Sequence, residues 1–215
     1  MRPYNLEWDD MSEYVVHFTR QIQNSSAYDN MMSILWNRVL HAGPFGLARR
    51  LAPDPDSQAS VCFSEVPLHL VQRIAQERGN HGIGFTKQFM IERGGNPIWY
   101  VERGSTLHDA IRAMTRETPT TLKPANDRIW QITPFIDVRG VNYQFEWERE
   151  WRHRGHLNFE VEDVAFLFIP EELHEAAREF FEEALRENTG PAYFCPYIDV
   201  GWSQERVRQA LMQQD

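Results

Sequence analysis

A stretch of alternating aromatic, acidic and basic residues at positions 145–155, FEWEREWRHRG, constrains the fold most strongly. Side chains alternate between the two faces of a β-strand, so Phe145, Trp147, Arg149 and Trp151 are expected to share one face. The other face then carries a row of charged residues, namely Glu146, Glu148, Glu150 and Arg152. Glutamate is a poor strand former. The row therefore indicates carboxylates that have a function or that meet cations, or else a solvated edge strand held by alternating charges.

The composition of the chain indicates an acidic protein with a substantial core. It has 215 residues, 42% hydrophobic content, 13 Phe and a formal net charge of −9. An acidic balance argues against sequence-independent binding of nucleic acid, which needs a basic surface. We expect one domain, 1–215, with a core from about 14 to 200, loops at 51–60 and 117–128, and a C-terminal helix at 203–214.

The cysteine and hydropathy patterns predict a soluble cytoplasmic protein. Cys62 and Cys195 stand far apart, and the first ten residues do not resemble a secretory signal. No run approaches 18 apolar residues, so no membrane segment is expected.

The order of the predicted elements indicates the α+β class. Strand patterns occur at 14–19, 61–64, 82–86, 96–101 and 164–169, and 129–138 is a strand-like run that Pro134 interrupts. Helices are expected after Ser26 or Asp29, from Ser105 and after Pro170. For the helix after Pro170 we expect a buried stripe of Leu173, Ala176, Ala177, Phe180, Phe181, Ala184 and Leu185. The pattern predicts mixed or antiparallel central sheets with peripheral helices.

Several polar residues at strand positions are candidates for chemistry. His17 and Thr19 share a face of the first strand, Ser64 ends another, and Tyr100 ends a third. Each also has an ordinary explanation: a histidine bonded to a backbone carbonyl, a turn before Pro67, or a core tyrosine. No CxxC pair or HExxH motif is present, so no metal is expected. Asp137 and Glu148 could serve a nuclease, although no lysine is near them.

The order of these motifs resembles the AbiG-type abortive-infection phage-resistance family over roughly residues 14–170. The resemblance is carried by His17-Phe18-Thr19 and by the segments at 32–35, 61–67, 82–87, 96–101 and 148–152. More distantly, the chain is similar to ADP-ribosyltransferase-like folds of the DarT type. The strand with His-x-Thr, the helix after it and a late strand that opens with a glutamate carry that likeness, and Glu148-x-Glu150 further resembles the Glu-x-Glu of arginine-specific transferases.

The distant resemblance implies NAD as a substrate and assigns roles to particular residues. Glu150 would stabilise an oxocarbenium-like transition state, and Glu148 would orient the acceptor. The implied NAD-binding residues are His17, Phe18, Thr19, Arg20, Ser64, Phe85, Tyr100 and Arg152. Among these, Phe85 or Tyr100 would stack on the nicotinamide ring, and Arg20 or Arg152 would hold the pyrophosphate. His17 and Glu150 are then expected to face one cleft.

The resemblance leads us to expect an ADP-ribosyltransferase-like enzyme that acts as a toxin or effector in anti-phage defence. Its partners would be NAD, a protein or nucleic-acid acceptor, and a cognate antitoxin or phage trigger. The alternative is a non-catalytic antitoxin or regulatory partner that binds a toxin or a nucleotide. A nuclease is the third possibility.

Overall fold

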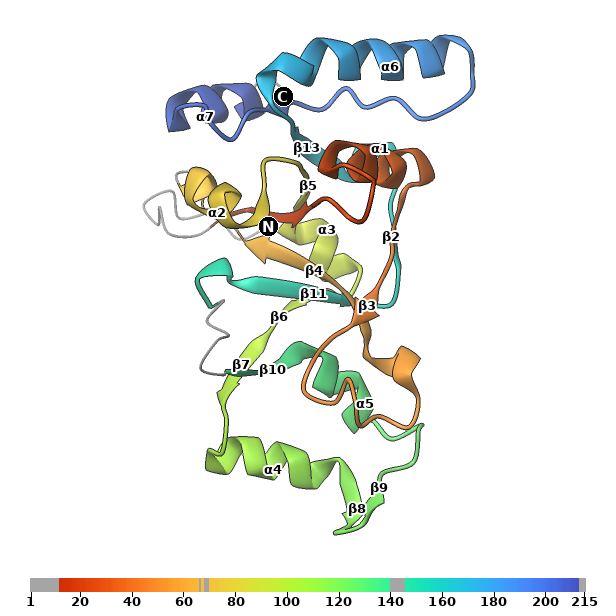
Figure 1. Cartoon of the computed structure of the whole chain (residues 1–215), viewed down its shortest axis with the longest axis vertical. Coiled ribbons are helices and arrows are strands. Elements are labelled where there is room, and N and C mark those ends of the chain that lie inside the picture. The colour runs from red at the N-terminus through yellow and green to blue at the C-terminus, as the bar shows by residue number, and fades with distance from the viewer. Residues whose placement is uncertain (1–11, 66, 68–69, 140–145, 213–215) are drawn as a thin grey trace. The chain divides into compact units, whose positions relative to one another are not determined.

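The structure, a computed structural model, describes residues 12–65, 67, 70–139 and 146–212 (Figure 1). Its contacts divide the chain into two compact units. Unit 1 comprises Met1–Val39, Phe63–Phe89 and Phe159–Asp215, and unit 2 comprises Leu40–Cys62 and Met90–Asn158. Strand β4 (Ala59–Glu65) and helix α3 (Lys87–Glu92) contribute residues to both units. Both units contain helices and strands, which confirms the α+β class, whereas the single domain stays a prediction.

Unit 1 is built on strands that occur in the order β14-β13-β5-β1-β4. They comprise β1 (Tyr14–Phe18), the last residues of β4, β5 (Gly82–Thr86), β13 (Val164–Phe168) and β14 (Tyr197–Ile198). Only the β13–β14 pair is parallel among these four pairings. Gly84 is required here, because a Cβ on it would lie 2.5 Å from the ring of Phe166 on the neighbouring strand.

The helices of unit 1 are α1 (Ala27–Asn37), α2 (Val71–Arg78), α6 (His174–Arg186) and α7 (Gln204–Met212). Short elements accompany them: β2 (Val39–Leu40), whose first residue lies in unit 1, and the 3-10 turns η5 (Val161–Asp163) and η6 (Glu171–Leu173). Helix α1 begins in a capping box, in which Ser26 and Asp29 bond each other's backbone N–H groups. Tyr193 joins α1 to α6, since its hydroxyl donates to Leu35 C=O at 2.7 Å and its ring contacts Phe181.

The buried stripe of α6 is narrower than the sequence suggests. Ala177, Phe181 and Ala184 are buried, at a spacing of four and three residues. Phe180 is 42% exposed and Leu185 is 54% exposed, so their assignment to the core was wrong. Seven apolar positions cover too wide an arc of the helix for a single neighbouring surface to bury them all.

The strands of unit 2 form short pairs, one of them with the first residues of β4. They comprise β3 (Gly43–Pro44), β6 (Asn96–Pro97), β7 (Trp99–Glu102), β8 (Arg116–Thr118), β9 (Thr121–Leu122), β10 (Ile136–Arg139), β11 (Glu150–Arg154) and β12 (Leu157–Asn158). Strand β3 pairs with β4 and β6 with β11, both antiparallel, whereas β10 and β7 run parallel. The parallel register places Asp137 opposite Tyr100.

The helical elements of unit 2 are α4 (Thr106–Met114), α5 (Ile129–Ile132), and the 3-10 turns η1 (Pro55–Gln58), η3 (Thr133–Phe135) and η4 (Glu146–Glu148). The strand-like run at 129–138 is therefore mostly helical, and only its last residues form a strand. Proline fixes its own φ and lacks an N–H, and both properties suit the first positions of the turn that Pro134 occupies.

The charged stretch at 145–155 does not form one long strand. Phe145 lies outside the described residues, η4 covers Glu146–Glu148, and β11 begins only at Glu150. Arg149 separates the two elements with a left-handed φ of 46°. Glu150, Trp151 and Arg152 are all buried, so the solvated edge strand, one of the alternatives that the pattern left open, is wrong for this strand.

None of the helices in the part of the chain that the structure describes is long and apolar enough to cross a membrane.

Candidate functional site

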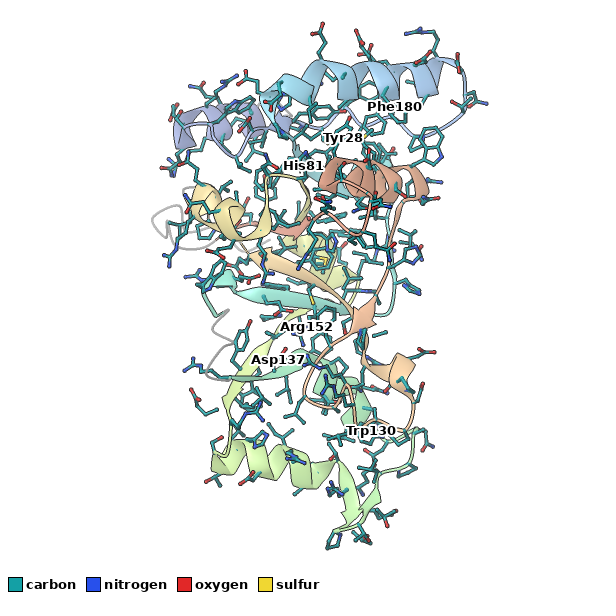
Figure 2. The ribbon with its side chains drawn as sticks, in the orientation of Figure 1. Tyr28, His81, Trp130, Asp137, Arg152 and Phe180 are labelled. Carbon is teal, nitrogen blue, oxygen red and sulfur yellow. The ribbon has the colours of Figure 1, made fainter. Side chains whose placement is uncertain are left out.

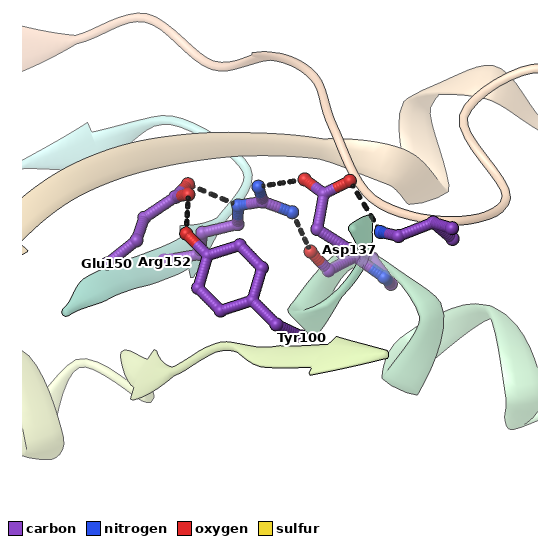
Figure 3. Close-up of polar contacts among 6 residues, drawn as sticks. Tyr100, Asp137, Glu150 and Arg152 are labelled. Atoms are coloured by element: carbon purple, nitrogen blue, oxygen red, sulfur yellow. Dashed lines mark hydrogen bonds and ion pairs between the residues drawn. The ribbon is translucent and has the colours of Figure 1, made fainter. Parts of the chain in front are cut away.

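A buried arginine is the centre of a polar cluster in unit 2 (Figure 3). Arg152 on β11 is 0% exposed. Its Nε donates to Glu150 Oε1 and its Nη2 to Asp137 Oδ2, both at 2.6 Å. Its Nη1 donates to Pro134 C=O at 2.7 Å, and its guanidinium lies 5.2 Å from the centre of the Phe45 ring. One cation thus joins two carboxylates from separate strands.

The two carboxylates of this cluster have further donors. Tyr100 on β7 donates its hydroxyl to Glu150 Oε2 at 3.2 Å, so both oxygens of Glu150 accept a hydrogen bond. Asp137 Oδ1 accepts from the N–H of Val138 at 3.0 Å. Glu150 is 8% exposed and Asp137 is 7% exposed. Such extensive bonding compensates the cost of removing three charges from water.

Local backbone structure explains how these side chains meet. Residues two apart on a strand share a face, which aligns Glu150 with Arg152 on β11. The parallel pairing of β10 with β7 brings Asp137 beside Tyr100. Ile98 N–H donates to Glu150 C=O at 2.9 Å and connects the start of β7 to β11.

The electrostatics of the cluster keep its arginine charged and its nearby thiol neutral. Burial by itself disfavours the charged guanidinium, but the attraction of Glu150 outweighs this and raises the pKa of Arg152 above its usual range. Burial, followed by the negative charge of Glu150, raises the pKa of the Cys62 thiol well above its ordinary value. Because the thiolate is the reactive form, Cys62 is a poor nucleophile near neutral pH.

The structure brings together only some of the residues that the sequence nominated. Tyr100, Glu150 and Arg152 belong to the cluster in unit 2. Glu148 is the last residue of the turn η4, two residues before Glu150, and is 4% exposed. The remaining nominated residues lie in unit 1. The expectation that His17 and Glu150 face one cleft stays a prediction, because the two residues belong to different units.

The nominated residues in unit 1 mostly make contacts that stabilise the sheet and α1. The ring of His17 contacts Phe63, and Phe18 stacks on Phe168. Thr19 is buried and donates its hydroxyl to Ala27 C=O at 2.8 Å, at the start of α1.

The other three nominated residues of unit 1 lie near the same strands. Arg20 is exposed, and its C=O accepts a bond from Asn30. Ser64 is buried in β4, and Phe85 is 0% exposed with its ring against Phe63, Phe89 and Phe159. The ligand-binding roles given to these residues stay predictions.

Comparison with known families identifies the chain. Residues 54–188, more than half of its length, match the model of a family described as "Putative abortive phage resistance protein AbiGi, antitoxin". The chain belongs to the AbiGi family. This confirms the expected relationship to AbiG-type abortive-infection proteins. No curated protein and no solved structure gives a significant match.

Membership of the AbiGi family corrects the expected function. The family is described as an antitoxin, which contradicts our expectation of an NAD-consuming toxin with ADP-ribosyltransferase chemistry. The alternative drawn from the sequence, a non-catalytic antitoxin, agrees with the family description.

The matched segment of the AbiGi family contains the whole Arg152 cluster, including one residue whose role the sequence did not reveal. Asp137 was considered only as a nuclease ligand, whereas it is the second carboxylate on Arg152. A buried arginine needs compensating acids. The presence of Arg152 in a predicted strand rich in aromatic residues could therefore have indicated that a second acid lies beside it. Among the described residues, no three His, Cys, Asp or Glu side chains gather as a metal site would require.

Proposed function

We propose that this chain is a non-catalytic antitoxin that neutralises a cognate toxin by binding it. The family match carries the proposal, because the matched model describes an antitoxin of an abortive-infection system. An antitoxin of this kind needs a stable scaffold and a surface for the toxin, but no reactive group.

The chemistry of the Arg152 cluster supports a structural role. Both oxygens of Glu150 accept hydrogen bonds, and the charge of Arg152 is shared between two acids. A catalytic carboxylate that stabilises a developing cation must be able to reach the reacting atoms. Glu150 is 8% exposed and is already paired, which favours a part in holding β7, β10 and β11 together. NAD as a ligand and the ADP-ribosyltransferase-like form of the fold stay untested.

An aromatic surface in unit 1, formed by Trp36 and Phe180, is our candidate for the toxin-binding face (Phe180 is labelled in Figure 2). Trp36 of α1 and Phe180 of α6 contact each other with ring centres 5.6 Å apart, and they are 38% and 42% exposed. Gly190 lies directly against the Trp36 ring, since a Cβ there would come within 2.4 Å of it. Partly exposed aromatic residues on a well-packed support are typical centres of protein interfaces.

The charges around this aromatic surface indicate the chemistry of the toxin. Helix α6 exposes four glutamates, namely Glu175, Glu179, Glu182 and Glu183, against two exposed arginines, Arg178 and Arg186; of the glutamates, Glu183 lies one turn from Phe180 on the same face. The whole chain carries a net charge of −9. Complementary charge speeds association and discriminates among partners. We therefore propose a toxin whose binding face has an apolar pocket surrounded by basic residues.

A growth assay tests this function. Cells that express the cognate toxin should stop growing, and co-expression of the wild-type chain should restore growth. The double variant Trp36→Ala with Phe180→Ala should lose neutralisation, because truncating a central aromatic contact costs about 2 kcal/mol or more in binding. Met114→Ala on α4 is the matched control, since it removes an apolar side chain that is 58% exposed in unit 2. Equal neutralisation by the double variant and the control would exclude this surface.

A further inference from the structure

Unit 2 contains a pocket whose wall is formed largely by arginines. Its volume is about 300 Å³, and the arginines that line it are Arg49, Arg50, Arg103 and Arg112. His108 and Asp137 complete its polar wall, and Gly46, Leu47 and Val138 supply the rest. The basic residues come from the loop after β3, the turn after β7, and α4, so three separate segments of unit 2 place cations around one space.

These arginines have no carboxylate partner within the part of the chain that the structure describes. The four are exposed, and the ion pairs among the described residues do not include them. By contrast, Arg139 on β10 pairs with Glu102 at 2.6 Å, and Arg38 pairs with Glu160. The chain has 31 acidic and 22 basic residues. Although acids outnumber basic residues, none of the ion pairs among the described residues involves the four arginines of the pocket. Their charges can therefore attract an anion from solvent.

The one carboxylate in the wall does not neutralise the pocket. Asp137 Oδ2 is paired with the fully buried Arg152, and its Oδ1 accepts the N–H of Val138. The negative charge of Asp137 is thus balanced from inside the protein. Four guanidinium groups remain to attract an anion from solvent.

The pocket is supported by a single apolar cluster. Val101 of β7, Ile111 of α4 and Ile136 of β10 form its buried centre, and Leu47 and Val138 pack against it. Every segment that lines the pocket therefore anchors a side chain in the same cluster. Preorganised side chains and loops lose less entropy when a ligand binds.

The loop that carries Arg49 and Arg50 is fixed by backbone bonds as well. Leu47 N–H donates to Ile136 C=O at 2.7 Å. Gly46 precedes it with φ +87°, and a Cβ there would lie 2.3 Å from Thr133 C=O. Only glycine fits this close approach, so the path of the loop is defined before any ligand arrives.

His108 adds an imidazole ring to the arginines. It is 7% exposed, and its Nδ1 lies 3.3 Å from the N–H of Gly104 and 3.2 Å from Asp109 Oδ1. When Nδ1 accepts from Gly104, the proton of the neutral ring is on Nε2. This nitrogen can then donate to an anion oxygen in the pocket.

We propose that this pocket binds the diphosphate group of a phosphate ester. Arginine forks match the paired oxygens of phosphate, and several of them can share one diphosphate. A volume of about 300 Å³ is at the small end of ligand pockets, which suits a compact, highly charged group. This inference is independent of toxin binding, because it concerns different residues in the other unit.

Calorimetric titration of the full chain tests the pocket. Pyrophosphate and ADP are the probes, and citrate is the polycarboxylate of comparable charge. We expect one saturable site for pyrophosphate, with ADP of similar or greater affinity and citrate at least about 10-fold weaker. The variant Arg49→Gln with Arg112→Gln should weaken pyrophosphate binding at least about 10-fold, and Arg103→Gln alone should weaken it measurably.

Arg139→Gln is the control variant, because Arg139 is an exposed arginine outside the pocket. It should leave pyrophosphate affinity unchanged, and the melting temperatures of all variants should match wild type. Absence of saturable binding would overturn the proposal. So would equal affinity for citrate, or a loss of binding in Arg139→Gln as large as in the double variant.

Discussion

Arg152 Nε donates to Glu150 Oε1 at 2.6 Å, and both side chains are almost completely buried on the same face of β11. The pair extends to Asp137 on β10 and to Tyr100 on β7, so an ion pair within one strand also connects two other strands. One alternative drawn from the sequence placed this glutamate on the solvated face of an edge strand, where a carboxylate contributes little to stability. The burial of Glu150 rules out that alternative.

We therefore predict that Glu150→Gln destabilises the fold. The substitution leaves the shape almost unchanged but removes one of the two charges that compensate the buried Arg152. Breaking a buried ion pair from one side costs about 3 kcal/mol or more. Chemical denaturation of the purified variant measures this directly.

The control for Glu150→Gln is Glu102→Gln. Glu102 also pairs with an arginine at 2.6 Å, but its side chain is 59% exposed. Exposed pairs contribute about 0–1 kcal/mol. Equal stability losses in the two variants would show that the burial of Glu150 has no energetic consequence.

Helix α6 provides a prediction about packing. Phe181 is 1% exposed and contacts Tyr193, whereas Phe180 is 42% exposed. Phe181→Ala should lower the free energy of unfolding by about 3–5 kcal/mol, because it leaves a cavity. Phe180→Ala should cost much less. A thermal melt that ranks the two variants in the opposite order would contradict the assignment of the buried face.

His81 in unit 1 predicts a loss of stability in mild acid. Both of its ring nitrogens are buried without a hydrogen-bond partner among the described residues, and Tyr28 packs against the ring (Figure 2). Burial lowers the pKa of His81 below its ordinary value of 6.5, although nearby Glu172 opposes the shift. As the pH falls, the unfolded chain therefore protonates His81 at a higher pH than the folded chain does. The free energy of unfolding is therefore fully retained above about pH 6.5. It decreases as the pH falls towards the folded-state pKa of His81, by at most about 1.4 kcal/mol per pH unit.

Comparing the free energy of unfolding at about pH 7.5 and pH 5.5 measures this effect. His153 adds to it in the same direction, because burial also lowers its pKa. His81→Gln should reduce the difference between the two pH values relative to wild type. An unchanged difference would assign the acid sensitivity to other groups.

The two cysteines should resist alkylation in the native protein. Burial raises the pKa of Cys195 to about 12, and burial together with Glu150 raises the pKa of Cys62. Iodoacetamide reacts with thiolates, so labelling near neutral pH should be slow until denaturant unfolds the chain. Mass spectrometry at successive times reports the labelled fraction. Rapid labelling of Cys62 in the native state would indicate an activated thiol.

Local sequence pattern predicted the elements whose side chains follow one simple period. The strand patterns at 14–19, 82–86 and 164–169 correspond to β1, β5 and β13, and the helix after Pro170 corresponds to α6. The prediction failed at 145–155, because the alternation of aromatic and charged residues does not reveal that both faces of a strand are buried. It also gave no sign that Arg149 adopts a left-handed conformation.

The candidate sites depended on contacts that no local pattern contains. Asp137 reaches Tyr100 through the parallel pairing of β10 with β7, and Arg152 joins them from β11. The sequence nominated Tyr100, Glu150 and Arg152 separately, but their association is a property of strand order. The arginine pocket was missed for the same reason, although the adjacent Arg49 and Arg50 and the scarcity of lysine were visible signals.

The central claim is that the chain acts by binding a toxin and performs no chemistry itself. The most direct test is to titrate the purified chain into its purified cognate toxin, while the same samples are assayed for nicotinamide release from NAD. We predict a saturable complex, at least about 30-fold weaker for the Trp36→Ala, Phe180→Ala double variant, and no nicotinamide release by the chain alone. NAD consumption by the purified chain that Glu150→Gln abolishes without unfolding it, together with no detectable complex, would contradict the account.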